Sequence, residues 1–133
     1  MGLFGKNDEK QAENEAMKAE LARLEALPLE QLAEEIFVRI YGDGGIGDDG
    51  GSVTLSQITN ELNPGKSVFG IDERVRSAFA PLLSEGVQVL EHARWIVGSF
   101  SGGDISSMGW ALTRAGRAAL ASGRTAVALA PRA

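Results

Sequence analysis

The segment that most constrains the fold of this chain runs from residue 94 to residue 122. It contains an apolar stretch, a polar loop with glycine, a second short apolar stretch and then a helical pattern. Two short apolar stretches joined by such a loop are typical of a β-hairpin. Thr113 stands directly before the helical pattern and is a suitable N-cap residue. The sequence therefore predicts a β-hairpin followed by a closing helix.

The closing helix and the two tryptophans give further expectations. We expect the helix to pack on residues 29–41 through four of its apolar residues: Ala115, Ala118, Ala119 and Leu120. Trp95 and Trp110 are expected on the two strands of the hairpin, where they can pack as cross-strand neighbours. The alternative is that one of them is exposed and anchors an interface.

Residues 29–41 carry the strongest helical pattern in the chain. Their apolar side chains recur at spacings of three and four residues, which places them on one face of a helix. Pro28 suits the start of this helix and Gly42 suits its end. The apolar face that we expect to be buried consists of Leu29, Leu32, Ala33, Ile36, Phe37, Ile40 and Tyr41.

The next segment, residues 42–52, is rich in glycine and aspartate and is expected to be a mobile surface loop. Val53 then forms a very short strand. Thr54 and Gln57 have the spacing of a capping box, in which each side chain bonds the backbone N–H of the other residue. This pattern predicts that a short helix begins after Thr54 and covers residues 55–62.

A further helix is expected over residues 72–93, with Asp72 as its N-cap. Pro81 and Gly86 interrupt its apolar pattern. Because proline removes a backbone donor and clashes with the preceding turn, we expect a kink or a break into two helices at these residues.

The N-terminal residues 8–27 are rich in Ala, Glu and Lys, which favour helix. They carry one narrow apolar seam formed by Met17, Leu21 and Leu24. One interpretation is that residues 1–28 form a charged helical arm that dimerises or docks on a partner. The other is a solvated, partly frayed extension, because short isolated helices are marginal in water.

The composition excludes several classes of protein. The 133 residues contain no cysteine, so disulfides, thiolate metal sites and thiol catalysis are excluded. The apolar runs are too short to span a bilayer, and we expect a cytoplasmic protein without a cofactor. A net charge of −5 argues against tight nonspecific binding to DNA.

No catalytic, metal or nucleotide motif is supported, so an enzyme is not expected. The glycine motif at residues 42–47 follows a helix, whereas a dinucleotide site needs a strand before it. Asp43, Asp48 and Asp49 do not complete a calcium loop. His92 is the single histidine and has no nucleophile at a suitable spacing. No small-molecule site is evident.

Residues 29–124 resemble a winged helix-turn-helix domain. Trp110, Leu112, Thr113 and Gly116 match the aromatic, Leu-Thr and Gly pattern found at the return strand and final helix of such regulators. The resemblance implies an α+β fold, mainly helical, with a three-helix core, a β-hairpin wing and a closing C-terminal helix. Residues 125–133 would be a flexible tail.

The resemblance implies DNA binding, by a transcriptional regulator or an accessory factor of a mobile element that acts as a dimer. The helix from Asp72 would enter the major groove, with the loop 101–108 beside the minor groove. The residues implied in contacts to double-stranded DNA are Lys66, Ser67, Arg74, Arg76, Ser77 and Arg94.

The alternative is a winged helix that acts by protein–protein contact or self-association and does not bind DNA. The acidic net charge and a wing loop with Asp104 and no cation favour this alternative. The folded arrangement of charge should discriminate the two. A continuous positive face over Lys66, Arg74, Arg76 and Arg94 would favour DNA, and scattered cations would favour a protein partner.

Overall fold

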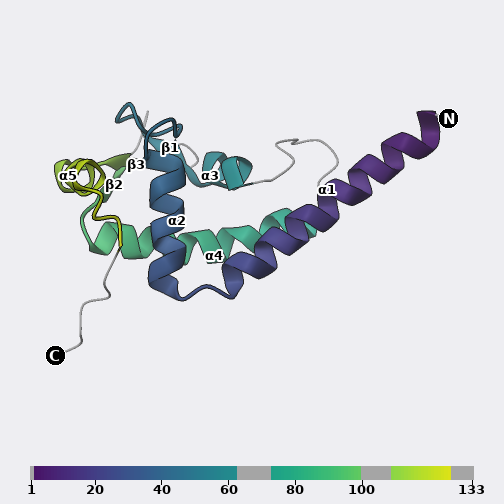
Figure 1. Cartoon of the computed structure of the whole chain (residues 1–133), viewed down its shortest axis with the longest axis horizontal. Coiled ribbons are helices and arrows are strands. Elements are labelled where there is room, and N and C mark those ends of the chain that lie inside the picture. Colours follow the sequence, from purple (N-terminus) through teal and green to yellow (C-terminus); the bar gives the residue numbers. More distant parts are fainter. Residues whose placement is uncertain (1, 63–72, 100–108, 127–133) are drawn as a thin grey trace.

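The computed structural model describes residues 2–62, 73–99 and 109–126, with the backbone alone at residues 2–11, 13, 73–76 and 99. In these parts of the chain, a small antiparallel sheet lies at the edge of a group of helices (Figure 1). The helices are α1 (Gly2–Glu25), α2 (Leu29–Tyr41), α3 (Leu55–Leu62), α4 (Glu73–His92) and α5 (Arg114–Ser122). The strands are β1 (Val53–Thr54), β2 (Ile96–Ser99) and β3 (Gly109–Leu112). The fold is α+β and mainly helical, as the sequence predicts.

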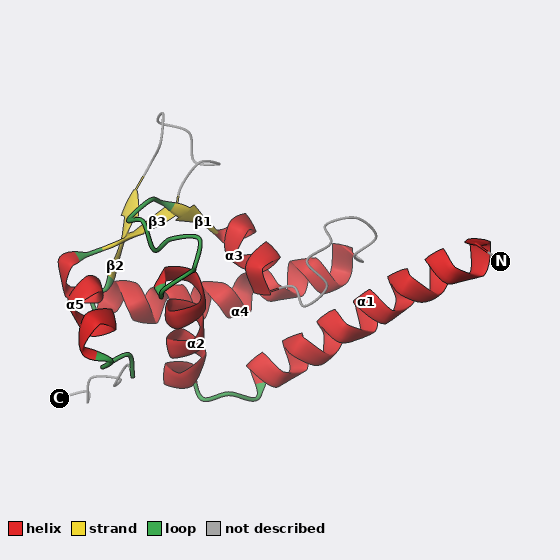
Figure 2. Ribbon diagram, turned by 45° about the horizontal axis from the view of Figure 1, so that its top comes forward, coloured by secondary structure: helices red, strands yellow, loops and turns green. Residues whose placement is uncertain are grey.

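The three strands form one sheet with β3 in the middle (Figure 2). β3 pairs antiparallel with β2, which confirms the predicted hairpin, and also with β1. Trp110 lies opposite Val53 on one side and Gly98 on the other. The loop predicted at residues 101–108 lies outside the described residues.

Trp95 and Trp110 are not cross-strand neighbours, which corrects that expectation. Trp95 precedes β2, and its ring centroid lies 4.8 Å from that of Phe37 on α2. The chain turns so sharply between α4 and β2 that residue 95 still belongs to the helix end, where its N–H donates to the carbonyl of Leu90. Trp95 therefore fixes the sheet to α2.

α2 is the centre of the hydrophobic core. It crosses α4 in both ribbon views, and its predicted apolar face is buried, with Leu29 partly buried at the edge (Figures 1 and 2). The Tyr41 hydroxyl donates a 2.7 Å hydrogen bond to the carbonyl of Trp110 and thereby links α2 to β3. Burial raises the pKa of Tyr41, so this hydroxyl stays a donor.

The start of α3 confirms the predicted capping box. The Gln57 N–H donates to the Thr54 hydroxyl at 3.2 Å, and the Thr54 N–H donates to the Gln57 side-chain oxygen at 2.9 Å. These bonds satisfy donors that the helix itself leaves unpaired. α3 therefore begins directly after Thr54 and covers Leu55–Leu62, as expected.

α4 is one helix of 20 residues, so of the two expected alternatives, a kink or a break into two helices, the break at Pro81 and Gly86 is wrong. Pro81 lies on the exposed side of the helix. Gly86 faces α2, and a methyl group there would come 2.5 Å from Cδ1 of Ile36. This glycine therefore lets two helices approach closely, and it does not end the helix.

α5 confirms Thr113 as its N-cap, because the Gly116 N–H donates to the Thr113 hydroxyl at 3.0 Å. The predicted contact face is only partly right. Ala119 is buried and Leu120 packs against the core, but Ala115 and Ala118 are exposed. The face is rotated because Gly116 is buried and packs against the carbonyl of Trp95.

α1 packs along α4 with its C-terminal half, while its N-terminal half extends away from the other helices (Figure 1). Met17 and Leu24 are buried in the core that α2 and α4 share, and Leu21 packs against that core. The apolar seam of the N-terminal arm is thus covered within a single chain.

Candidate functional site

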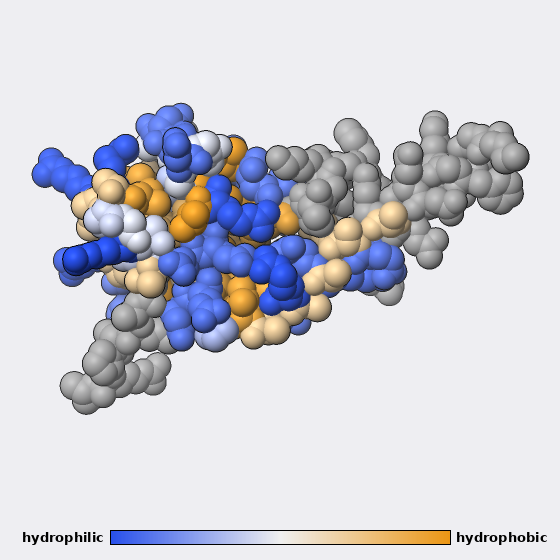
Figure 3. Space-filling view, in the orientation of Figure 1, coloured by the Kyte–Doolittle hydropathy of each residue, from blue (hydrophilic) through white to orange (hydrophobic). Residues whose placement is uncertain are grey.

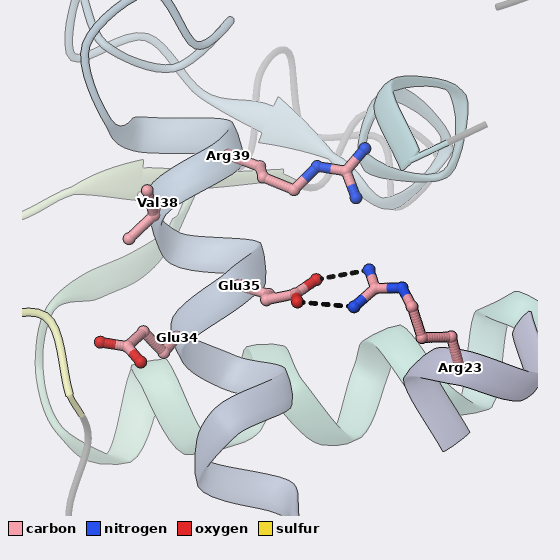
Figure 4. Close-up of a pocket in the computed structure, with 5 residues that line it drawn as sticks. All are labelled: Arg23, Glu34, Glu35, Val38 and Arg39. Atoms are coloured by element: carbon pink, nitrogen blue, oxygen red, sulfur yellow. Dashed lines mark hydrogen bonds and ion pairs between the residues drawn. The ribbon is translucent and has the colours of Figure 1, made fainter. Parts of the chain in front are cut away.

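A network of charged side chains holds α1 against α2. The Arg23 guanidinium donates two 2.8 Å hydrogen bonds to the Glu35 carboxylate (Figure 4). It also pairs with Glu20. The bond from Arg23 lowers the pKa of Glu35. Arg39 donates to the carbonyl of Glu61 at 3.3 Å. An open hollow of about 520 Å³ lies beside these groups. Its charged side chains already have partners, because Arg23, Glu35 and Arg39 belong to the network and Glu34 accepts a hydrogen bond from the Thr125 hydroxyl. We interpret the network as a clamp between helices.

The clamp gives a pH-dependent prediction. Replacing Arg23 with glutamine should lower the free energy of unfolding at pH 7 by less than about 1 kcal/mol, because the pair is exposed. The pKa of Glu35 is lowered in the folded chain, so the contribution is complete above its ordinary value of 4.5 and is lost as the pH falls through the folded value. Urea unfolding at pH 7 and at successively lower pH should show the difference narrowing below pH 4.5.

A matched control for that measurement is Lys18→Gln. Lys18 forms a looser pair with Glu15 at 3.7 Å on the same helix, so its loss should change stability less at every pH. An Arg23 effect that persists unchanged at pH 3 would contradict the assignment to Glu35.

The described residues predicted to contact DNA are divided between the two ends of α4. Lys66 and Ser67 lie outside the described residues. Arg74, Arg76 and Ser77 share the first turns of α4, where Ser77 is exposed. Arg94 follows the other end of α4, and the 16 helical steps from Arg76 to His92 alone span about 24 Å along the helix axis at about 1.5 Å each.

The exposed face of α4 carries no cation in the part with described side chains. The exposed residues on this face, from Ser77 onward, are Ser77, Pro81, Glu85, Gln88 and His92. They are spaced by three and four residues and form one stripe. Among these five residues, Glu85 is the single Asp or Glu, and none is Lys or Arg. The stripe suits polar or apolar contact better than contact with phosphates.

Charge is divided between the two ends of the sequence, a feature that counts over residues 1–28 and 29–124 do not reveal. Residues 1–92 contain 8 Lys or Arg and 17 Asp or Glu, whereas residues 93–133 contain 5 Arg and 1 Asp. Counting charged residues separately before and after the end of α4 shows this division from the sequence alone. Four of these arginines are described and exposed: Arg94, Arg114, Arg117 and Arg124. Figure 3 shows strongly hydrophilic side chains that project at the α5 end.

A groove lies between α2, α5 and the loop after α2. Its volume is about 520 Å³. Val38, which is 44% exposed, Leu112 and Leu120 give it apolar walls. Asp43, Asp48 and Arg117 also line it. The groove combines apolar contact area with charges of both signs.

The acidic loop after α2 has a structural explanation. The Asp48 carboxylate accepts the N–H of Gly44, and the Asp49 carboxylate accepts the N–H of Gly51. Gly44 and Gly50 have φ values of 83° and 86°, which favour glycine. The aspartates therefore stabilise tight turns.

Among the described residues, no group of three or more His, Cys, Asp or Glu side chains could hold a metal ion. Within the same residues, each helix is too short or too polar to cross a membrane. Searches against protein-family models, curated protein sequences and solved structures find no match to this chain.

Proposed function

We propose that this chain is a winged-helix module that acts through protein–protein contact. The order α2, β1, α3, α4, β2, β3 and the sheet order β1-β3-β2 support this architecture, with α2, α3 and α4 as the three-helix core. In it, α4 corresponds to the recognition helix and the β2–β3 hairpin to the wing. α5 closes the domain after the wing.

One observation carries the choice of a protein partner over DNA. The exposed stripe of α4, from Ser77 to His92, has no Lys or Arg and includes Glu85. A recognition helix in the major groove lies between two phosphate backbones, where a carboxylate is repelled and cations are needed. A face of Ser, Pro, Gln and His can instead be desolvated against another protein at low cost.

Self-association through the apolar seam of α1 is a version of this proposal with less support. Met17 is 1% exposed and Leu24 is fully buried in the single chain. A second copy could use the seam Met17, Leu21 and Leu24 only if α1 left α4. The exposed face of α4 needs no such rearrangement, so a different protein is the better partner.

DNA binding is the second candidate, and the position of two arginines favours it. Arg74 and Arg76 stand at the N-terminal end of α4, which is the end that contacts base edges in helix-turn-helix proteins. Lys66 and Ser67 precede this helix in the sequence. Such a site would be confined to the first turn of α4.

Two measurements on the full chain test the proposal. Fluorescence anisotropy with a labelled pool of genomic duplex DNA at 50 mM NaCl should show no saturable binding at protein concentrations below about 10 µM. Nonspecific DNA-binding proteins reach dissociation constants of about 1 µM at physiological salt, so this concentration range would detect such binding. Cross-linking in host extract should then recover a protein that is lost in a Glu85→Arg/Gln88→Ala variant of the α4 stripe.

Saturable DNA binding that disappears in an Arg74→Ala/Arg76→Ala variant would overturn the proposal in favour of the second candidate. Recovery of the same proteins by the wild type and by the α4-stripe variant would contradict the use of this helix face.

A further inference from the structure

We propose that three arginines, Arg94, Arg114 and Arg117, form a surface that binds an acidic segment of a partner protein. We call it the α5 basic surface. The inference deepens the proposed function and rests on it, because it names the chemistry of one contact with the partner. It concerns the end of the molecule at which α4 stops and α5 begins.

The fold brings these arginines together from distant positions in the sequence. The Thr113 hydroxyl donates to the carbonyl of Arg94 at 2.5 Å, and the Thr113 N–H donates to the carbonyl of Trp95 at 3.0 Å. Arg94 therefore lies beside the start of α5, where Arg114 is the first residue. Arg117 follows one turn later on the same helix and is exposed, as are the other two.

The guanidinium groups of the α5 basic surface are available for a ligand. Among the described residues, none of the three forms a hydrogen bond or an ion pair with another side chain. Arg23 and Arg39, in contrast, both pair with carboxylates of the clamp. The surface thus carries three cations without an ion-pair partner among the described side chains, on a chain whose net charge is −5.

Arg94 occupies a position that local energetics would assign to glycine. Its φ is 63°, in the left-handed region, and among the described residues it is the only one other than glycine with positive φ. The chain turns there in a Schellman motif, because the N–H groups of Trp95 and Arg94 donate to the carbonyls of Leu90 and Glu91. The same motif ends α5 with Gly123, whose φ is 72°.

Arg114 is also placed against local preference. It begins α5, and the first turn of this helix contains no acidic residue. The N-terminus of a helix carries partial positive charge, which favours Asp or Glu and repels arginine. Two adjacent arginines at positions that disfavour them indicate a requirement for positive charge, because departures from local rules are expected at functional sites.

A short acidic protein segment fits this surface better than a nucleic acid. A nucleic acid is a long, uniform polyanion, and on either side of the surface it would meet the acidic remainder, in which residues 1–92 carry 8 basic and 17 acidic groups. Asp43 and Asp48 line the groove next to Arg117, so a continuous polyanion that crossed the groove would be repelled, whereas a short segment can place its carboxylates on the arginines alone. Val38 and Leu120 in that groove can instead hold an apolar side chain beside the carboxylates.

The test uses a fluorescein-labelled peptide of ten residues in which glutamate alternates with leucine, and the full chain at 50 mM NaCl. We expect the Arg114→Gln/Arg117→Gln variant to bind this probe at least about tenfold more weakly than the wild type, because two charge-assisted contacts are lost. Lys18→Glu is the matched control. Like the double variant, it changes the net charge by −2, but at an exposed position of α1. We expect it to change the affinity for the peptide by less than about twofold.

Arg94→Gly separates binding from structure. It should weaken binding of the probe about threefold through loss of one cation. It should also raise the midpoint of thermal unfolding by about 2–6 °C, because glycine adopts φ 63° without strain. A merely structural role for Arg94 would leave the affinity for the peptide unchanged.

Equal affinity of the double variant and the wild type for the peptide would overturn the proposal, as would equal losses in the double variant and in Lys18→Glu. Tighter binding of a 20-base-pair duplex through the same arginines would overturn the class of partner. These outcomes are distinct from failure of the proposed function, since the peptide assay leaves the α4 stripe unaltered and the cross-linking assay leaves these arginines unaltered.

Discussion

Replacing Phe37 with alanine is expected to lower the free energy of unfolding by about 3–5 kcal/mol. The Phe37 side chain is fully buried on α2. Its ring centroid lies 4.8 Å from that of Trp95 and 6.1 Å from that of Tyr41. Removing the ring would leave a cavity between α2 and the chain entering β2. The surrounding structure cannot close this cavity without moving the sheet.

Val38→Ala is the matched control for this prediction. Val38 is the next residue on the same helix, but its side chain is 44% exposed. Its truncation should cost less than about 1 kcal/mol, as expected for a surface position. Urea unfolding monitored by tryptophan fluorescence measures both variants. Similar losses for the two would contradict the assignment of Phe37 to the centre of the core.

Elements whose signals are local were predicted well from the sequence. The bounds of α2 and α3 agree with the expected residues 29–41 and 55–62. In α3 the reason is the Thr54–Gln57 capping box, whose two hydrogen bonds involve only neighbouring residues. In α2 the apolar face extends over three turns, so one helix register buries all of it.

Predictions that depended on tertiary contact were less reliable. Pro81 and Gly86 are helix breakers by local rules, yet α4 continues through both. Burial of the face with Phe79 and Leu83 offsets the local cost, and Gly86 even favours the contact with α2. Ala115 and Ala118 were expected to be buried but are exposed. Alanine is found on either face of a helix, so the sequence alone does not identify the buried face of α5.

The candidate site was harder to predict than the fold for a related reason. Arg94 and Arg114 are 20 residues apart, and only the hairpin between them brings them together. The conformation of Arg94 could not be read from the sequence, because glycine and not arginine indicates a left-handed helix end. Arg74 and Arg94 carry the same charge, yet a continuous helix keeps them at opposite ends.

Gly116→Ala is expected to destabilise the chain by about 2–3 kcal/mol, although alanine favours an exposed helix by about 1 kcal/mol over glycine. A methyl group at residue 116 would lie 2.2 Å from the carbonyl oxygen of Trp95 and 2.8 Å from Cδ1 of Leu112. The first of these atoms belongs to the backbone, so α5 itself would have to move. That movement would also disturb the hydrogen bond between Thr113 and Arg94 on which the α5 basic surface depends.

Gly123→Ala distinguishes this crowding from backbone strain. Gly123 has a φ of 72° and nothing within 4 Å of an added methyl group. Its replacement should therefore cost only the left-handed conformation, about 1 kcal/mol. Thermal and urea unfolding of both variants should give a clearly larger loss at residue 116. If Gly116→Ala is as stable as the wild type, α5 does not pack against Trp95, and the positions of Arg114 and Arg117 beside Arg94 are wrong with it.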